Sequence, residues 1–186
     1  PYALACGWKI PARVESIIVI SGLGQLSDSE TIRDMRWYVR PVLSLGRYAP
    51  RLLSMVTGII GHVAIRWPTI FMRILVHNLV PPDNLAFKMH PGIRKILQNS
   101  VQEALRQDHH GVTQDLILYT DSWGFKPEQV LTHIHVWHGT DDPVVPVAHA
   151  RALIAKLPHV HQHILQNDGH YSVPLNHMDA IFRVLR

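Results

Sequence analysis

The sequence has almost no cysteine and no clustered charge. Cys6 is the one cysteine in 186 residues, which excludes an internal disulfide framework and a four-cysteine zinc site. Because Cys6 lies among Ala, Leu and Trp, we expect it to be a buried helical residue. The basic side chains stand singly, so the net charge of +4 indicates a mildly basic protein without a nucleic-acid partner. No signal peptide is visible, and we expect a cytoplasmic protein.

Two chemical motifs are also missing near the amino terminus. A Gly-x-Ser-x-Gly turn would present a nucleophilic serine, but Val19 stands where a turn centred on Ser21 needs its first glycine. Gly22 and Gly24 lack the third glycine of a dinucleotide fingerprint, and no second strand ending in an acid follows about 20 residues on. We therefore expect residues 21–24 to form a plain turn and the protein to use no cofactor.

What the sequence does contain is a set of short apolar segments that predict strands. Val14–Ile20 is β-branched and almost unbroken, which is typical of a strand buried on both faces. Ile134, Val136 and Trp137 form a second apolar run, and Val160–Leu165 a third. Helices are expected at Tyr2–Ile10 and Val147–Leu157. This alternation of strands and helices indicates an α/β protein.

A polar loop follows each of the last two expected strands. The first loop, Gly139-Thr140-Asp141-Asp142-Pro143, carries two carboxylates, and the second, Asn167-Asp168-Gly169-His170, ends in a histidine. Open α/β sheets place their sites just past the carboxyl ends of the strands, so an Asp and a His from successive strands can meet there. An Asp holds the imidazole in one tautomer and stabilises its cation, as a catalytic base requires.

Residues 26–120 predict several short helices rather than strands. Apolar side chains recur at helical spacing and are interrupted by prolines, and Ser27 and Glu30 are spaced as a capping box. Further helices are expected at His90–Gln107 and Gly111–Thr120. An all-helical insertion between strands is typical of a cap that covers a site and shapes a substrate pocket.

The most apolar part of this insertion lies between Arg51 and Arg66. The uncharged stretch is shorter than the roughly 18 residues of a membrane-spanning helix, and it contains Gly58, Gly61 and His62. We favour an apolar cap together with an apolar substrate channel. An interfacial helix with weak contact to a membrane surface is an alternative. A surface for a protein partner and a transmembrane span are two further alternatives.

The spacing of the two polar loops resembles one known family. The pattern Gly139-x-x-Asp142-x-x-x-Pro146, then a helix, a strand and Gly169-His170, is similar to the α/β-hydrolase fold, whose triad runs nucleophile, acid, histidine in chain order. The resemblance implies that Asp142 is the acid and His170 the base.

Four other residues are weaker candidates or supporting features. Asp141 does not fit the spacing of the acid, Asp121 would be an acid displaced by one strand, and His177 falls in the expected last helix. A Trp123-Gly-Phe turn before the acid strand is frequent in the family and is expected to anchor the chain against the core.

The start of the chain resembles the segment that follows the family's nucleophile elbow. Pro1–Cys6, a helix and then a strand would place Gly-x-Ser-x-Gly-Gly just upstream of Pro1. The resemblance therefore implies a partial fold: hydrolase core at 1–25, helical cap at 26–120, and core with the acid and histidine loops at 121–186. Nucleophile and oxyanion donors would both be absent, and we expect a fragment that is inactive alone.

The function that the resemblance implies is serine-type hydrolysis of a small apolar ester or related acyl substrate. If the missing nucleophile is an Asp, the family precedent would instead be an epoxide hydrolase or haloalkane dehalogenase. A different class of function is a non-catalytic interaction protein that uses the hydrolase-like sheet and its apolar helices for docking.

Histidines supply a further alternative, a metal-dependent hydrolase. The sequence has 14 histidines, and two groups are close in sequence: His133, His135 and His138, then His159, His161 and His163. A His-x-His pair on a strand faces one side and could hold a metal. The usual His-x-His-x-Asp-His pattern is absent, however, so we expect strand-edge histidines and no metal.

Overall fold

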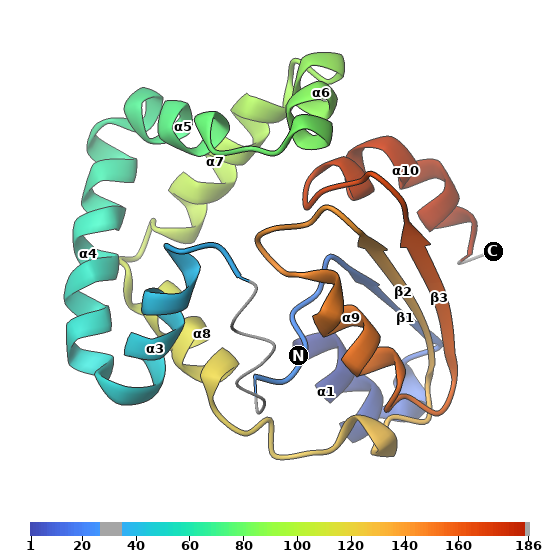
Figure 1. Ribbon diagram of the computed structural model, residues 1–186. Coiled ribbons are helices and arrows are strands. Elements are labelled where there is room, and N and C mark those ends of the chain that lie inside the picture. The colour runs from blue at the N-terminus through green and yellow to red at the C-terminus, as the bar shows by residue number, and fades with distance from the viewer. Residues whose placement is uncertain (27–34, 185–186) are drawn as a thin grey trace.

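The computed structural model describes residues 1–26 and 35–184, and its centre is a sheet of three parallel strands (Figure 1). The strands are β1 (Ser16–Ile20), β2 (His133–Gly139) and β3 (Val160–Leu165), in the order β1-β2-β3. Parallel strands need crossover connections, which helices provide here. The predicted α/β class is confirmed.

Helices cover both faces of the sheet. Helices α1 (Tyr2–Lys9) and α9 (Val147–Ile154) pack on one face, and α10 (Ser172–Arg183) packs on the other. The first face buries an apolar core made of Leu4, Ile17, Phe125, Val130, Ile134, Val136, Ala150, Leu153 and Leu157. The second core consists of Trp137, Val173 and Ile181. Each such side chain contributes roughly 1.5–3 kcal/mol when it is fully buried, so these two cores hold the loops at the strand ends in place.

The helical insertion connects β1 to β2 and stands beside the sheet in Figure 1. Within its described residues the helices are α3 (Val39–Tyr48), α4 (Pro50–Arg66), α5 (Pro68–His77), α6 (Pro81–Met89), α7 (Ile93–Ala104) and α8 (His110–Thr120). Pro50, Pro68 and Pro81 each occupy a first helical turn, where the missing N–H costs nothing. The interrupting prolines of the sequence are therefore helix starts.

Two short 3₁₀ helices complete the described elements, at Pro11–Arg13 and Pro127–Gln129. Phe125 is buried in the first core and stacks on Trp8 with ring centroids 5.3 Å apart. Trp123 packs against the same core, and Gly124 between them has a φ of 73°, which favours glycine. The turn therefore anchors the chain as expected.

No single helix among the described residues has the length and hydropathy to cross a membrane. Helices α4 and α5 satisfy both conditions only together, as a pair bent by 110°.

Some local expectations were wrong. Cys6 is exposed, because it lies on the outer side of α1. Of the strand expected over Val14–Ile20, residues 16–20 are extended and only Ile17 among them is fully buried. The helix expected over His90–Gln107 is shorter, at Ile93–Ala104. The expected capping box of Ser27 and Glu30 lies outside the described residues.

Candidate active site

Two loops at the carboxyl ends of neighbouring strands bring Asp142 and His170 together. Asp142 follows β2, and His170 follows β3. Nδ1–H of His170 donates to Oδ2 of Asp142 at 2.7 Å. The side chain of Asp142 is fully buried, whereas that of His170 keeps 24% of its surface exposed. The pair predicted from the sequence is therefore in direct contact, with the histidine on the open side.

The other oxygen of Asp142 is held by the backbone. The N–H groups of Val144 and Val145 both donate to Oδ1 at 2.9 Å. These two bonds form because the chain turns sharply after Asp142, before α9 begins. A buried carboxylate needs such donors, since desolvation without them is costly. They fix the carboxylate so that Oδ2 faces the imidazole.

His138 is a second histidine beside Asp142, and it is completely buried. Its Nε2–H donates to the backbone oxygen of Val145 at 2.8 Å and lies 3.6 Å from Oδ2 of Asp142. Burial lowers the pKa of His138, and the bond to Val145 and the charge of Asp142 oppose that shift only in part. The imidazole is thus held neutral, bracing the loop that carries the acid. Sequence analysis noted His138 only as a possible ligand; its i,i+4 spacing to Asp142 was the available signal.

The competing candidates lie elsewhere. Asp141 is exposed and accepts a bond from the hydroxyl of its neighbour Thr140 at 3.0 Å. Asp121 is exposed at the end of α8 and accepts the N–H of Ser122. His177 lies in α10, as expected, and its Nε2 is 2.8 Å from Oδ2 of Asp168. None of these three contacts His170.

The histidine loop requires two close backbone approaches. A Cβ on Gly139 would lie 2.1 Å from the backbone oxygen of Asp168, and one on Gly169 would lie 2.6 Å from Oδ1 of Asp83. Either contact would force neighbouring atoms to shift, so glycine lets the end of β2 approach the backbone after β3 and lets the loop approach the carboxylate of Asp83.

Asp83, in the first turn of α6, was not identified from the sequence. It is 1% exposed. Its carboxylate accepts the N–H groups of His170 at 3.1 Å, Tyr171 at 2.9 Å and Ser172 at 2.7 Å. These donors lie at the start of α10, where the helix dipole also favours an anion. Burial raises the pKa of Asp83, although the three N–H bonds pull it down. Asp83 therefore ties the insertion directly to the loop of the candidate base.

A cavity of about 400 Å³ lies next to this tie. Its walls are mostly apolar and come from the insertion and from the two loops of the site. The lining residues are Trp37, Tyr38, Phe71, Ile74, Leu75, Asn78, Leu79, Val80, Asp83, Pro143, Val144 and Tyr171. Val144 is one of the donors to Asp142, and Tyr171 follows His170, so the cavity adjoins both candidate residues.

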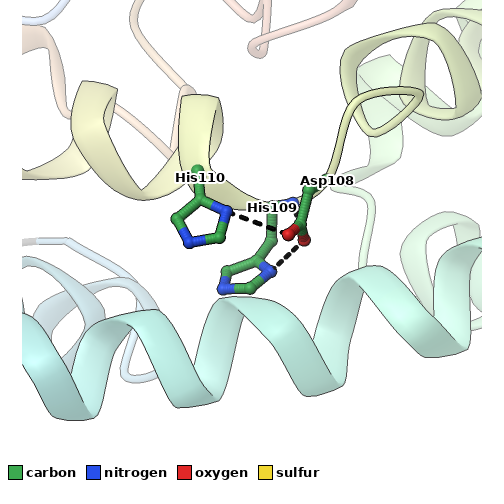
Figure 2. A group of neighbouring side chains, drawn as sticks. All are labelled: Asp108, His109 and His110. Carbon is green, nitrogen blue, oxygen red and sulfur yellow. Dashed lines mark hydrogen bonds and ion pairs between the residues drawn. The ribbon is translucent and has the colours of Figure 1, made fainter.

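One group in the insertion has the residue types of a metal site. Figure 2 shows Asp108, His109 and His110, whose ligand atoms all lie within 4.8 Å of one another. Nδ1 of His110 is 2.9 Å from Asp108, Nδ1 of His109 contacts the same carboxylate, and Nε2 of His109 is 3.1 Å from Oγ of Ser54. The group could hold a divalent ion. All three residues are consecutive, and their nitrogens are already paired with one carboxylate.

The histidines of β2 and β3 form a stacked row instead of a ligand set. Trp137 stacks on His163, and His163 and His161 each stack on His135. Nδ1 of His135 also lies 3.3 Å from Nε2 of His163, but among the described residues no three of these histidines bring their ligand atoms together. His138 points to the opposite face of the sheet from His135, because side chains alternate along a strand. The two predicted histidine groups are not assembled into one site.

Comparisons with known proteins show the fold but no sequence family. No protein-family model matches the chain. No curated protein matches it by sequence. Solved structures do match over almost the whole chain. An esterase from Thermogutta terrifontis has a TM-score of 0.57 and 17% identity, with coverage of 99% of this chain and 58% of that one.

Two other solved enzymes match in the same way. The 2-hydroxy-6-oxo-6-phenylhexa-2,4-dienoate hydrolase from Rhodococcus sp. strain RHA1 has a TM-score of 0.56 and 20% identity, covering 98% of this chain and 57% of that one. An enol-lactonase from Burkholderia xenovorans LB400 has a TM-score of 0.58 and 12% identity, covering 98% and 59%.

A parallel sheet with an acid loop and a histidine loop at successive strand ends, and a helical insertion above them, defines a hydrolase-like architecture. The chain has the α/β-hydrolase fold and corresponds to its carboxyl-terminal portion. It spans 57–59% of the length of these three solved chains.

Proposed function

We propose that Asp142 and His170 are the acid and base of a nucleophile–histidine–acid triad in a hydrolase of small apolar acyl substrates. The observation that carries the proposal is the 2.7 Å bond from Nδ1 of His170 to a carboxylate whose other oxygen is held by two N–H groups. This bond leaves Nε2 as the proton acceptor, because Nδ1 keeps its hydrogen.

The reaction would proceed by acyl transfer. A nucleophilic hydroxyl attacks the acyl carbon while Nε2 of His170 takes its proton, and Asp142 stabilises the resulting cation. The same proton then passes to the leaving group. Water then attacks the acyl carbon while Nε2 takes its proton, the bond from the acyl carbon to the nucleophile oxygen breaks, and Nε2 returns the proton to that oxygen.

The nucleophile and the oxyanion donors are proposed to lie outside these 186 residues. Among residues 1–26 and 35–184, no side chain is hydrogen-bonded to Nε2 of His170, and Ser21 reaches only the backbone oxygen of His170, at 3.2 Å. The solved relatives are longer chains. We therefore expect the 186-residue chain alone to turn over no ester.

The apolar cavity supports a small apolar acyl group as substrate. Phe71, Leu75 and Val144 form apolar walls of the cavity. Tyr171, the residue after the candidate base, also lines it. Two of the solved enzymes are named as an esterase and an enol-lactonase, and esters and lactones share an electrophilic carbon that such a pocket could position.

The test uses the protein as produced by its natural source, with a fluorophosphonate probe and p-nitrophenyl butyrate. We expect a labelled serine in a peptide outside the 186 residues. His170→Ala and Asp142→Asn should each lower turnover by at least roughly a thousandfold. Asp141→Asn and His161→Ala are matched controls, because both side chains are exposed, and they should retain activity.

Each other outcome would reassign the protein. Labelling of Ser21, or turnover by the 186-residue chain that depends on His170, would refute the external nucleophile. Incorporation of ¹⁸O from water into an Asp would favour epoxide or haloalkane chemistry. A protein with no label and no turnover would support the non-catalytic interaction function.

A further inference from the structure

Helix α4 presents an apolar face to solvent. Leu52, Met55 and Ile59 are 48%, 65% and 66% exposed and lie on one side of the helix at spacings of three and four residues. The opposite side is buried against the insertion by Leu53, Thr57, Gly61 and Ala64. The exposed face is thus a true surface of a well-anchored helix, since its other side already has its packing partners.

An arginine followed by an exposed aromatic residue lies at each end of α4. Before the helix, the guanidinium of Arg47 lies 5.6 Å from the ring centroid of Tyr48, which is 78% exposed. After it, Arg66 lies 5.9 Å from the ring of Trp67, which is 46% exposed. Exposed aromatic rings with an apolar body and a polar edge are enriched at membrane–water interfaces. Arginine reaches phosphate headgroups while its stem stays in the apolar layer.

The charge around this face has one sign. Residues 35–82, which include α3, α4 and α5, contain six arginines and no Asp, Glu or Lys. The whole protein, by contrast, has 14 acidic residues against 18 basic ones. Such a segment attracts anionic surfaces, because it contains no carboxylate of its own to offset its positive charge.

We infer that α4 docks in the plane of an anionic lipid bilayer, with Leu52, Met55 and Ile59 in the headgroup–acyl boundary and the terminal arginines on lipid phosphates. An in-plane helix needs an apolar face flanked by basic residues and does not need to span the bilayer. This inference does not depend on the proposed catalysis. Helix α5 begins one residue after Trp67 and its Phe71 lines the cavity, so docking would bring that cavity near the lipid.

The test is sedimentation with vesicles of phosphatidylcholine alone or with added phosphatidylglycerol. We expect binding to the anionic vesicles, weakened when NaCl rises from about 0.1 M to about 1 M because the Debye length falls from about 10 Å to about 3 Å. Met55→Gln/Ile59→Gln should reduce partitioning by roughly tenfold or more, since both side chains would lose their apolar burial.

The arginines are tested separately. Arg47→Gln/Arg66→Gln should weaken binding by about fivefold for each arginine. The matched control is Arg94→Gln/Lys95→Gln, which removes the same charge from the exposed surface of α7. For the apolar pair the control is Leu131→Gln, because Leu131 is 65% exposed outside the insertion. Neither control should change binding by more than about twofold, because Arg94, Lys95 and Leu131 all lie outside the docking face.

Three outcomes would overturn the inference. One is an absence of binding to anionic vesicles by the folded protein. Another is binding that the α4 variants and the controls weaken equally, which would reflect net charge alone. The third is self-association that Met55→Gln/Ile59→Gln abolishes in protein that ignores vesicles, which would assign the face to a second copy of the chain.

Discussion

Asp83 is the residue through which the insertion acts on the histidine loop. It lies 87 positions before His170 in the sequence, yet its carboxylate accepts the N–H groups of His170 and of the two residues after it, where the loop passes into α10. No local sequence pattern predicts this role, because Pro81-Pro82-Asp83 indicates only the start of a helix. The bonds hold the backbone at His170 without touching the imidazole, so Asp83 is a positioning residue.

Replacing Asp83 should destabilise the fold measurably. Asp83→Ala leaves three buried N–H groups without an acceptor, and we expect a loss of roughly 2–4 kcal/mol in the free energy of unfolding. Asp83→Asn should cost less, because its amide oxygen still accepts. Urea unfolding measures both, with Asp179→Ala on the exposed side of α10 as control. Equal losses for the Ala and Asn variants would contradict this account.

Gly169 is coupled to the same carboxylate. A methyl group there would overlap Oδ1 of Asp83, so Gly169→Ala should destabilise by about 1–3 kcal/mol, as overpacking does. Gly92→Ala is the control, because nothing lies within 4 Å of that position. In the Asp83→Ala background the clash partner is gone, and the extra cost of Gly169→Ala should shrink. Full additivity in the double-mutant cycle would show that the two residues do not meet.

At the scale of elements, the sequence predicted what depends on local pattern. β3 and the start of α9 lie where expected, because apolar runs and turn residues bound them. The predicted bounds and burial of an element were less accurate where tertiary contacts determine them. β1 was expected to be buried on both faces, yet among residues 16–20 only Ile17 reaches the first core completely. Ile18 and Ile20 face the other side of the sheet, where they pack against the second core but are only partly buried.

The helices of the insertion are joined by a contact that no pattern reveals. Thr57 on α4 and Thr113 on α8 have their hydroxyls 2.6 Å apart, and both are buried. Thr57 is a helix-interior β-branched polar residue, which a sequence reading takes for a surface position. The hydroxyl of Thr57 also donates to the backbone oxygen of Leu53 at 3.0 Å, so it contacts both its own helix and α8.

The pair should show non-additive stability. Thr57→Val alone leaves the hydroxyl of Thr113 facing a methyl group, at a cost of about 1–2 kcal/mol. The double variant Thr57→Val/Thr113→Val removes both hydroxyls and should cost less than the sum of the single variants. Thermal unfolding of the four proteins measures the coupling. Costs that add within about 0.3 kcal/mol would exclude an energetic link between α4 and α8.

For the whole molecule, family-level spacing was enough to place the acid and the histidine on neighbouring strand ends. What it could not supply is the environment of each group, since that is built by contacts between distant segments. The stacking of His163 on Trp137 and His135 depends on strand register. A one-residue shift would turn every side chain to the other face.

The buried His138 and the partly buried His135 and His163 make the stability of the protein depend on pH. Burial lowers the pKa of His138, and burial followed by the neighbouring imidazoles lowers the pKa of His135 and of His163. The unfolded chain has the ordinary pKa of 6.5, so it takes up protons at a pH where the folded protein does not. The free energy of unfolding is therefore not reduced by these histidines above about pH 6.5, and it falls as the pH decreases below that value.

Urea midpoints measured between about pH 8 and about pH 5 should decline on the acidic side, where histidines begin to titrate. His135→Gln/His163→Gln should flatten the decline, because two of the protonatable groups are gone. His62→Gln is the control, since His62 is exposed on α4, and it should leave the slope unchanged. A midpoint that rises toward acidic pH, or a decline that the double variant leaves intact, would mean that the stacked histidines are not what links folding to protons.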